Sequence, residues 1–200
     1  MVRLTSEDDL TTPYGLAKAL DAINTPNATI VLFGALPCTG GSQWQRLNWH
    51  RGDAVTRHKI QGHRKIFRVL WRNFVILEER CFALGGGVAF EWPRSCAYWH
   101  DRSVKAFIRR HNLTEVHFDG CMYGLESSTP KTSGKLIRKP WTIATSMREL
   151  NLLCRKCDHN PSEHAPCAGT DTKATEGYTD ELVTNLHAAI EQWCDAQGAL

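Results

Sequence analysis

The sequence predicts an α/β fold of the three-layer, Rossmann-like kind, with a mostly parallel sheet, a loop rich in cysteine and histidine, and a terminal helix. Two observations predict this class. Short apolar runs alternate with longer segments whose apolar residues recur every three or four positions. The hydrophobic share of 42% is enough for a buried core. We expect a single α/β domain over residues 1–200, with the cysteine- and histidine-rich loop at 146–170 inside it.

The first half of the chain contains one buried strand and one long helix. Residues 11–24 are expected to form a helix, because Pro13 suits its first turn after a threonine cap. Residues 28–36 are continuously apolar, as in a strand buried on both faces of a parallel sheet, and they end at the turn 37–41. Residues 54–84 form the longest helix, which the glycines at 85–87 end. Its expected apolar stripe consists of Ile66, Leu70, Phe74, Leu77, Cys81 and Leu84.

The second half alternates strands and helices. Residues 88–91 are a short apolar strand that Trp92 and Pro93 end, and residues 96–111 return as a helix. Residues 115–119 and 136–145 follow as strands, the second at an edge or with a bulge because it contains Pro140. Residues 179–197 form a last amphipathic helix. Such alternation predicts parallel strands, with ligands bound at their carboxyl ends.

The charge of the chain is small in total but unevenly placed. Residues 1–157 carry 23 Lys/Arg and 13 Asp/Glu, whereas residues 158–200 carry Lys173 and eight acidic residues. A basic body indicates a polyanionic partner, either nucleic acid or a nucleotide, and the two parts also have the charges to attract one another. The sequence shows no apolar run that would cross a bilayer and no signal-peptide core. We therefore expect an intracellular protein, cytoplasmic or nuclear, without a membrane partner.

The densest group of metal-ligand residue types lies in the segment 154–167, which contains three cysteines and two histidines. Thiolate and imidazole are the ligands that zinc prefers, and short Cys-x-x-Cys and Cys-x-His steps suit a tetrahedral ion. We expect a structural zinc ion with Cys157, His159 and His164 as three of its ligands. Cys121, on the turn after the third strand, is the expected fourth ligand. Cys154 and Cys167 are the alternatives.

An open fourth coordination position would instead give a zinc hydrolase, with a metal-bound water and Glu163 nearby as a base. The sequence contains neither His-Glu-x-x-His nor His-x-Glu followed by Pro-Cys-x-x-Cys. The absence of both motifs favours the structural site. A set of thiols and histidines that bind no metal is the remaining alternative.

A cysteine and a glutamate stand at the ends of two predicted strands. Cys38 follows the first strand and precedes Thr39 and two glycines, where free N–H groups can stabilise a thiolate. Glu91 closes the next strand in sequence. If the strands are neighbours, both side chains face one crevice, where a thiolate can attack an electron-poor ring while the acid holds a ring nitrogen. A buried structural thiol and a salt-bridging glutamate are the alternatives.

This order of elements resembles the catalytic half of DNA cytosine-C5 methyltransferases over about residues 28–145: an apolar strand, Pro-Cys, a long helix, a second apolar strand and Glu-x-Pro. In that family the Pro-Cys turn supplies the nucleophile for cytosine C6, and a strand-end glutamate binds the base edge. The resemblance therefore implies that Cys38 is the catalytic nucleophile and Glu91 the base-binding acid.

The chain departs from that family at several positions. Thr39 stands where the family has a glutamine after the cysteine, and Trp92 where it has an asparagine after the glutamate. Residues 119–125 replace its Gln-x-Arg-x-Arg element. No segment before Cys38 resembles the glycine-rich loop for S-adenosylmethionine, so the resemblance does not extend to the methyl donor.

Basic and aromatic residues suggest where a nucleic acid would bind. Four arginines on one face of the long helix are spaced to follow a phosphate backbone, and a solvated helix face is the alternative explanation. They are Arg57, Arg64, Arg68 and Arg72. Tryptophans near the two strand ends are candidates for stacking a base. They are Trp44, Trp49, Trp92 and Trp99.

Three functional hypotheses follow from these residues. The first is a nucleotide- or nucleic-acid-modifying enzyme, a methyltransferase-like transferase that uses Cys38 and Glu91. The second is a non-catalytic, zinc-stabilised nucleic-acid-binding protein. The third is a cysteine-dependent transferase or hydrolase that acts on another class of substrate.

Overall fold

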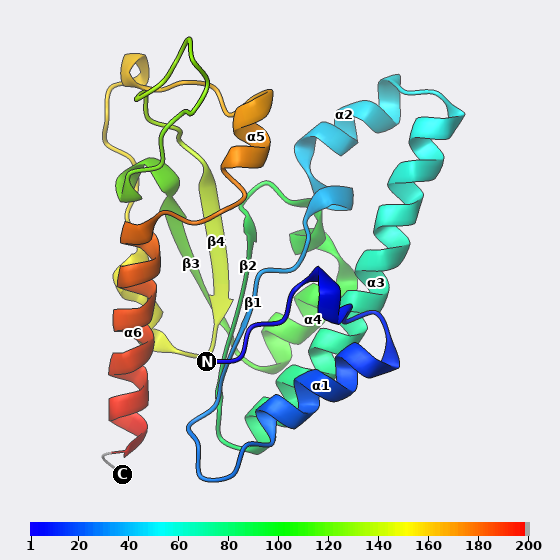
Figure 1. Ribbon diagram of the computed structural model, residues 1–200, viewed down its shortest axis with the longest axis vertical. Coiled ribbons are helices and arrows are strands. Elements are labelled where there is room, and N and C mark those ends of the chain that lie inside the picture. The colour runs from blue at the N-terminus through cyan, green and yellow to red at the C-terminus, as the bar shows by residue number, and fades with distance from the viewer. Residues whose placement is uncertain (199–200) are drawn as a thin grey trace. The chain divides into compact units, whose positions relative to one another are not determined.

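The computed structural model describes residues 1–198, and the chain divides into two compact units (Figure 1). The N-terminal unit covers residues 1–113, and the C-terminal unit begins at Thr114. Each unit has its own strands and its own core and is described by itself. The single domain over residues 1–200 that the sequence suggests stays a prediction. Within residues 1–198, none of the helices combines the length and apolar character that crossing a membrane requires.

The N-terminal unit combines a parallel strand pair with α-helices. In chain order its main elements are α1 (Pro13–Ile23), β1 (Val31–Gly34), α2 (Gln43–Arg51), α3 (Ala54–Ala83), β2 (Gly87–Pro93) and α4 (Arg102–Arg110). The short 3-10 helices η1 (Ser6–Asp8), η2 (Thr39–Gly41) and η3 (Ala97–His100) lie between them. β1 and β2 pair in parallel, from Val31 opposite Gly87 to Gly34 opposite Phe90. The expected α1, α3 and parallel strands are thus confirmed, but β1 is only half-buried along most of its length.

Capping side chains determine where these helices begin. Thr12 accepts a hydrogen bond from the Gly15 N–H (3.1 Å) at the start of α1, and Asp53 accepts one from the Thr56 N–H (2.8 Å) at the start of α3. Sequence periodicity did not predict α2, because none of its residues is buried and it has no apolar stripe. Its start at the Ser42 cap was the only local signal.

An aromatic core joins α3 to β2 and to the segment after β2. Phe67 stacks on Tyr98 with ring centroids 3.5 Å apart, and Trp71 meets Phe90 edge-on at 5.2 Å. Trp92 and Trp99 belong to this core, at 1% and 9% exposed, with ring centroids 5.0 Å apart. The expectation that these two tryptophans stack a base is therefore wrong, because their rings pack inside the protein.

The buried face of α3 differs from the predicted stripe at both ends. Ile66 and Leu84 are 51% and 44% exposed, whereas Ile60 and Phe67 are buried. The core face is thus rotated around the helix relative to the expected stripe, toward the side that carries Arg64. Arg64 is consequently half-buried rather than fully solvated.

The C-terminal unit contains an antiparallel strand pair and one long helix. Its elements are β3 (Thr114–Asp119), η4 (Gly120–Tyr123), β4 (Pro140–Thr145), η5 (Arg148–Leu153), η6 (Pro161–Glu163), α5 (Thr170–Ala174) and α6 (Asp180–Gly198). β3 and β4 are paired from Thr114 opposite Thr145 to Asp119 opposite Pro140. Pro140 occupies the first position of its strand, a place that strands tolerate for proline.

The antiparallel pairing corrects the predicted mostly parallel sheet and, with it, the three-layer Rossmann-like fold. A parallel pair needs a long crossover, usually an α-helix, between its strands. Residues 120–139 contain the 3-10 helix η4 but no α-helix, so β4 returns beside β3 in the opposite direction. The broader α/β class is confirmed.

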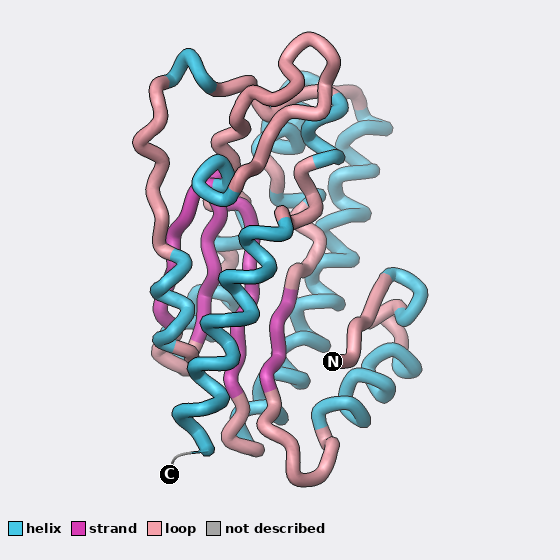
Figure 2. Tube along the Cα trace, turned by 60° about the vertical axis from the view of Figure 1, so that its left-hand side comes forward, coloured by secondary structure: helices cyan, strands magenta, loops and turns pink. Residues whose placement is uncertain are grey.

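Helix α6 buries one face in the core of the C-terminal unit and lies alongside the β3–β4 pair (Figures 1 and 2). Its buried residues recur at three- and four-residue steps: Leu182, Leu186, Ala189 and Trp193. η5 packs against this helix through buried Leu150 and Leu153. The predicted helix at 179–197 is confirmed.

One carboxyl group is buried in the N-terminal unit without a hydrogen-bond partner. Glu78 on α3 is 0% exposed, and neither of its carboxylate oxygens has a partner among the described residues. Burial, followed by the charge of Glu79, raises the pKa of Glu78 well above its usual range. The folded state therefore binds more protons than the unfolded state between the two pKa values, and stability falls as the pH rises through that window.

We therefore expect Glu78→Leu to stabilise the protein at pH 8 by about 1–3 kcal/mol, because it removes an unpaired buried carboxyl. The variant should also lose the decline in stability that we expect of the wild type as the pH rises from the usual pKa of a glutamate toward the raised pKa of Glu78. Denaturant melts at several pH values measure both effects. Glu126→Gln is the control, because it removes an exposed carboxyl that does not contribute to the pKa shift of Glu78. A Glu78→Leu protein less stable than the wild type at pH 8 would contradict this account.

Candidate functional site

Four metal-ligand side chains converge at the end of β3. The ligand atoms of Cys121, Cys157, His159 and His164 all lie within 4.8 Å of one another. These are the four residues that the sequence favours, and their arrangement can hold a metal ion. Burial, followed by the neighbouring Cys157 thiol, raises the pKa of Cys121 to about 12, so a bound cation would have to displace a proton there.

The distances between these atoms suit a tetrahedral ion. The Cys157 sulfur lies 3.5 Å from His159 Nδ1 and 3.4 Å from His164 Nε2. Metal–sulfur and metal–nitrogen bonds of about 2.3 and 2.0 Å place such atoms about 3.6 Å apart in a tetrahedron. His164 Nδ1 lies 3.1 Å from the Asn160 carbonyl oxygen, which favours a proton on Nδ1 and leaves Nε2 for the metal.

Backbone contacts hold the ligand loop against the strand end. The Asp119 N–H donates to the Arg155 carbonyl (2.9 Å), and Asp119 Oδ2 accepts from the Cys157 N–H (2.9 Å). Leu136 N–H donates to the Glu163 carbonyl, and the Leu136 carbonyl accepts from the Ala165 N–H. The chain is thus fixed on both sides of the two histidines. Sequence reasoning missed Asp119, although its place at the carboxyl end of a strand was a signal.

The other candidate ligands lie outside this cluster. Cys154 is exposed, and the Cys167 sulfur contacts Thr175 Oγ1 at 3.4 Å. The Glu163 carboxylate accepts from the Asn160 N–H (2.8 Å) as part of a capping box. Glu163 therefore serves the turn that carries His164, an arrangement that does not favour the zinc-hydrolase alternative.

Cys38 and Glu91 both lie near a third residue, Cys96. Burial is the main cause that raises the pKa of Cys96 to about 12, and the charges of Cys38 and Glu91 add to that shift. Cys38 caps η2 and is half-exposed, and Glu91 is half-buried on β2. Cys38 and Glu91 therefore both lie within electrostatic range of Cys96. Their catalytic roles stay a prediction.

Two glycines allow the Cys38 turn to pack against η3. A Cβ atom on Gly40 would lie 2.4 Å from the Tyr98 hydroxyl oxygen, and one on Gly41 would lie 2.9 Å from the Cys96 sulfur. A larger residue at either position would push the turn away from η3. The Cys-Thr-Gly-Gly sequence is thus explained by this close approach.

The predicted arginine row divides in the structure. Arg64 and Arg68 line a pocket together with Trp49, Gln61 and Lys65. Arg57 Nε donates to the Trp49 carbonyl (3.2 Å), and Arg72 Nε donates to Asn73 Oδ1 (3.4 Å). Of the tryptophans considered for stacking, Trp49 is half-exposed and faces this pocket. Sequence reasoning missed Gln61, since a lone glutamine on a helix carries no signal.

The pocket belongs to a strongly basic helical hairpin, which we define as residues 42–68. It consists of α2 and the first half of α3, and it extends beyond the strand pair of the N-terminal unit (Figure 1). It carries seven Lys/Arg and one acidic residue, Asp53. No residue between Gly41 and Ile60 is buried. Apart from the buried Ile60 and Phe67, the hairpin therefore exposes most of its charge to solvent.

The sequence matches no protein-family model. Comparisons with curated proteins and with solved structures likewise gave no match. Functional arguments for this chain therefore rest on its own residues and geometry.

Metal binding can be tested with a matched pair of cysteine variants. We expect purified wild-type protein to bind one equivalent of cobalt(II) with the visible absorption of a tetrahedral thiolate site. Cys157→Ser should lose that spectrum because it removes a ligand at the centre of the cluster. Cys154→Ser should keep it, because Cys154 is exposed and outside the cluster. An unchanged spectrum in Cys157→Ser would exclude this ligand set.

Proposed function

We propose that this protein binds nucleic acid through the basic hairpin of residues 42–68. The observation that carries the proposal is the exposed charge of this hairpin: six of its seven basic side chains are exposed, Arg64 is half-buried, and one acid opposes them. Uncompensated charge on a projecting element costs folding free energy through self-repulsion, and a polyanion offsets that cost. Arg64 and Arg68 on successive turns of α3 supply planar groups that suit phosphate oxygens.

The resident metal in this proposal is zinc, with a structural role. Two thiols and two imidazoles form a closed set of four ligands, which leaves no position for a reacting water. When bound, the ion would cross-link η4 to the loop 155–165. Asp119 would orient the Cys157 backbone, and Asn160 would hold the His164 ring.

The nucleic-acid proposal predicts a salt-dependent affinity that is specific to the hairpin. We expect Lys65→Gln/Arg68→Gln to weaken binding of a labelled 12-nucleotide strand about tenfold in fluorescence anisotropy. The slope of log affinity against log salt should fall by about 1.4, since each lost phosphate contact on a single strand contributes about 0.7.

The control is Arg102→Gln/Arg109→Gln, which removes the same charge from exposed positions on α4. It should leave the affinity within about twofold and the slope unchanged, because long-range charge effects are screened in salt. Equal losses in the two double variants would show non-specific attraction, and affinity independent of salt would exclude phosphate contacts by the hairpin.

A second candidate function is base chemistry at Cys38, as the resemblance to cytosine-C5 methyltransferases implies. The proximity of Cys38 and Glu91 to Cys96 supports it. In the proposed step the Cys38 sulfur bonds to cytosine C6, and C5 takes a proton from water. C5 then loses its original proton, and the C6–S bond breaks, which restores the base.

This step exchanges the C5 hydrogen of cytosine with solvent and needs no methyl donor. We expect a cytosine-containing strand in heavy water to gain deuterium at C5, as measured by mass spectrometry, with the wild type and with Cys154→Ala. Cys38→Ala should reduce the rate at least about a hundredfold, since it removes the nucleophile. Exchange at the same rate in Cys38→Ala would rule out this role.

A further inference from the structure

The pocket between α2 and α3 has an unusual mixture of side chains. It has a volume of about 360 Å³ and is lined by Trp49, Gln61, Arg64, Lys65 and Arg68. Three of these side chains are cationic, one is a large aromatic ring and one is a neutral amide. No acidic side chain among the described residues forms an ion pair with any of the three cations. The pocket therefore offers positive charge that the protein itself does not neutralise.

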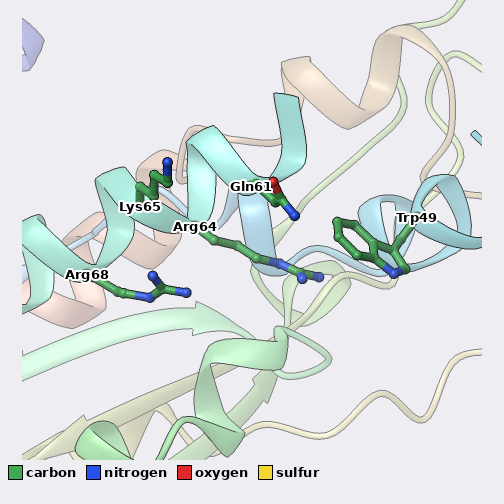
Figure 3. Close-up of a pocket in the computed structure, with 5 residues that line it drawn as sticks. All are labelled: Trp49, Gln61, Arg64, Lys65 and Arg68. Carbon is green, nitrogen blue, oxygen red and sulfur yellow. The ribbon is translucent and has the colours of Figure 1, made fainter. Parts of the chain in front are cut away.

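Arg64 is held in place before any ligand arrives. Its Nε donates to the Gly40 carbonyl (3.4 Å), and its guanidinium carbon lies 4.9 Å from the centre of the Trp49 ring. Figure 3 shows Arg64 reaching toward Trp49, with Gln61 beside it and Arg68 extending on the same side of α3. A guanidinium fixed in this way loses little conformational freedom when it binds, so more of its contact energy appears as affinity.

The chemistry of the lining selects among anions. Two guanidinium groups on successive turns suit one phosphate, but a bare phosphate would leave the indole ring and the Gln61 amide unused. Aromatic rings and guanidinium planes stack bases, and an amide can donate to and accept from a base edge. The volume is at the lower end of the range of small-ligand sites, about 300–1,000 Å³, which suits one nucleotide unit.

A base inside a duplex cannot lie on these planes, because both of its faces are covered by neighbouring bases. We propose that this pocket binds one unpaired nucleoside monophosphate unit, with its phosphate on Arg64 and Arg68 and its base stacked against the cation–π pair that Arg64 and Trp49 form. The inference rests on the proposed nucleic-acid binding and narrows it to single-stranded segments. A free nucleotide has the same chemistry and is distinguished by experiment.

The test compares an aromatic residue of the pocket with one outside the hairpin on two kinds of nucleic acid. Trp49→Leu removes the pocket ring, and Tyr14→Leu removes an aromatic side chain on α1 that is 73% exposed and lies outside the hairpin. Affinities for a 12-nucleotide strand and for the matching blunt duplex are measured at the same salt concentration. We expect Trp49→Leu to weaken single-strand binding about tenfold, as the loss of one stacked base does, and to change duplex binding less than about twofold. Tyr14→Leu should change neither by more than about twofold.

The possible outcomes distinguish a failure of the pocket assignment from a failure of the proposed nucleic-acid binding. If Trp49→Leu leaves the ratio of single-strand to duplex affinity unchanged, or if Tyr14→Leu lowers that ratio equally, the pocket assignment is overturned while nucleic-acid binding stands. If neither nucleic acid binds at low salt, the proposed function itself fails.

A competition experiment on the wild-type protein tests the inference even if the Trp49→Leu variant does not fold. Adenosine monophosphate should displace the labelled strand at a concentration at least about tenfold below that of inorganic phosphate, because only the nucleotide can stack. Equal displacement by the two would overturn the base-binding part. Binding of adenosine monophosphate in equilibrium dialysis, without binding of any strand, would identify a free nucleotide as the ligand and overturn the single-strand assignment.

Discussion

The position of Arg64 between the Trp49 ring and the Gly40 carbonyl is the interaction on which the candidate site depends. α2 has no buried residue, so burial of apolar surface does not fix it against α3. Contacts with Trp49 do so instead: Arg64 packs over its ring and Arg57 donates to its carbonyl. The same Arg64 side chain bonds to the turn that begins at Cys38. One arginine thereby links the basic hairpin to the thiol-bearing turn.

In the C-terminal unit, hydrogen bonds to neighbouring segments hold a loop that contributes little to the core. Its ligand loop is attached to β3 through Asp119 and to the segment around Leu136, and the four ligand atoms meet between these attachments. Such hydrogen bonds to the ligand loop orient the ligand side chains before a metal binds, so less of the loop has to become ordered on binding. In both units, therefore, specific polar contacts hold a candidate site in place.

Local sequence patterns predicted much of this structure, but the features that depend on contacts between distant segments were not predicted. The threonine cap of the first helix, the extent of α3 and the ligand spacing around Cys157 could all be identified from short stretches of sequence. The antiparallel direction of β4 could not, because no local pattern distinguishes it from a parallel strand. α2 was missed because it lacks an apolar stripe. The Trp49 pocket was not predictable as a whole, since its five side chains come from two helices whose packing the sequence does not specify.

The most direct test of the central claim is a nuclear magnetic resonance titration of labelled protein with a short single strand. The chain has seven tryptophans, each with its own indole N–H signal, and Arg64 has a distinct Nε–H signal. The account predicts that the Trp49 indole and the Arg64 Nε–H signals shift most, and that the signals of buried Trp92 and Trp141 stay in place. Shifts confined to residues outside the hairpin of residues 42–68, or an unperturbed Trp49 signal at saturation, would contradict it.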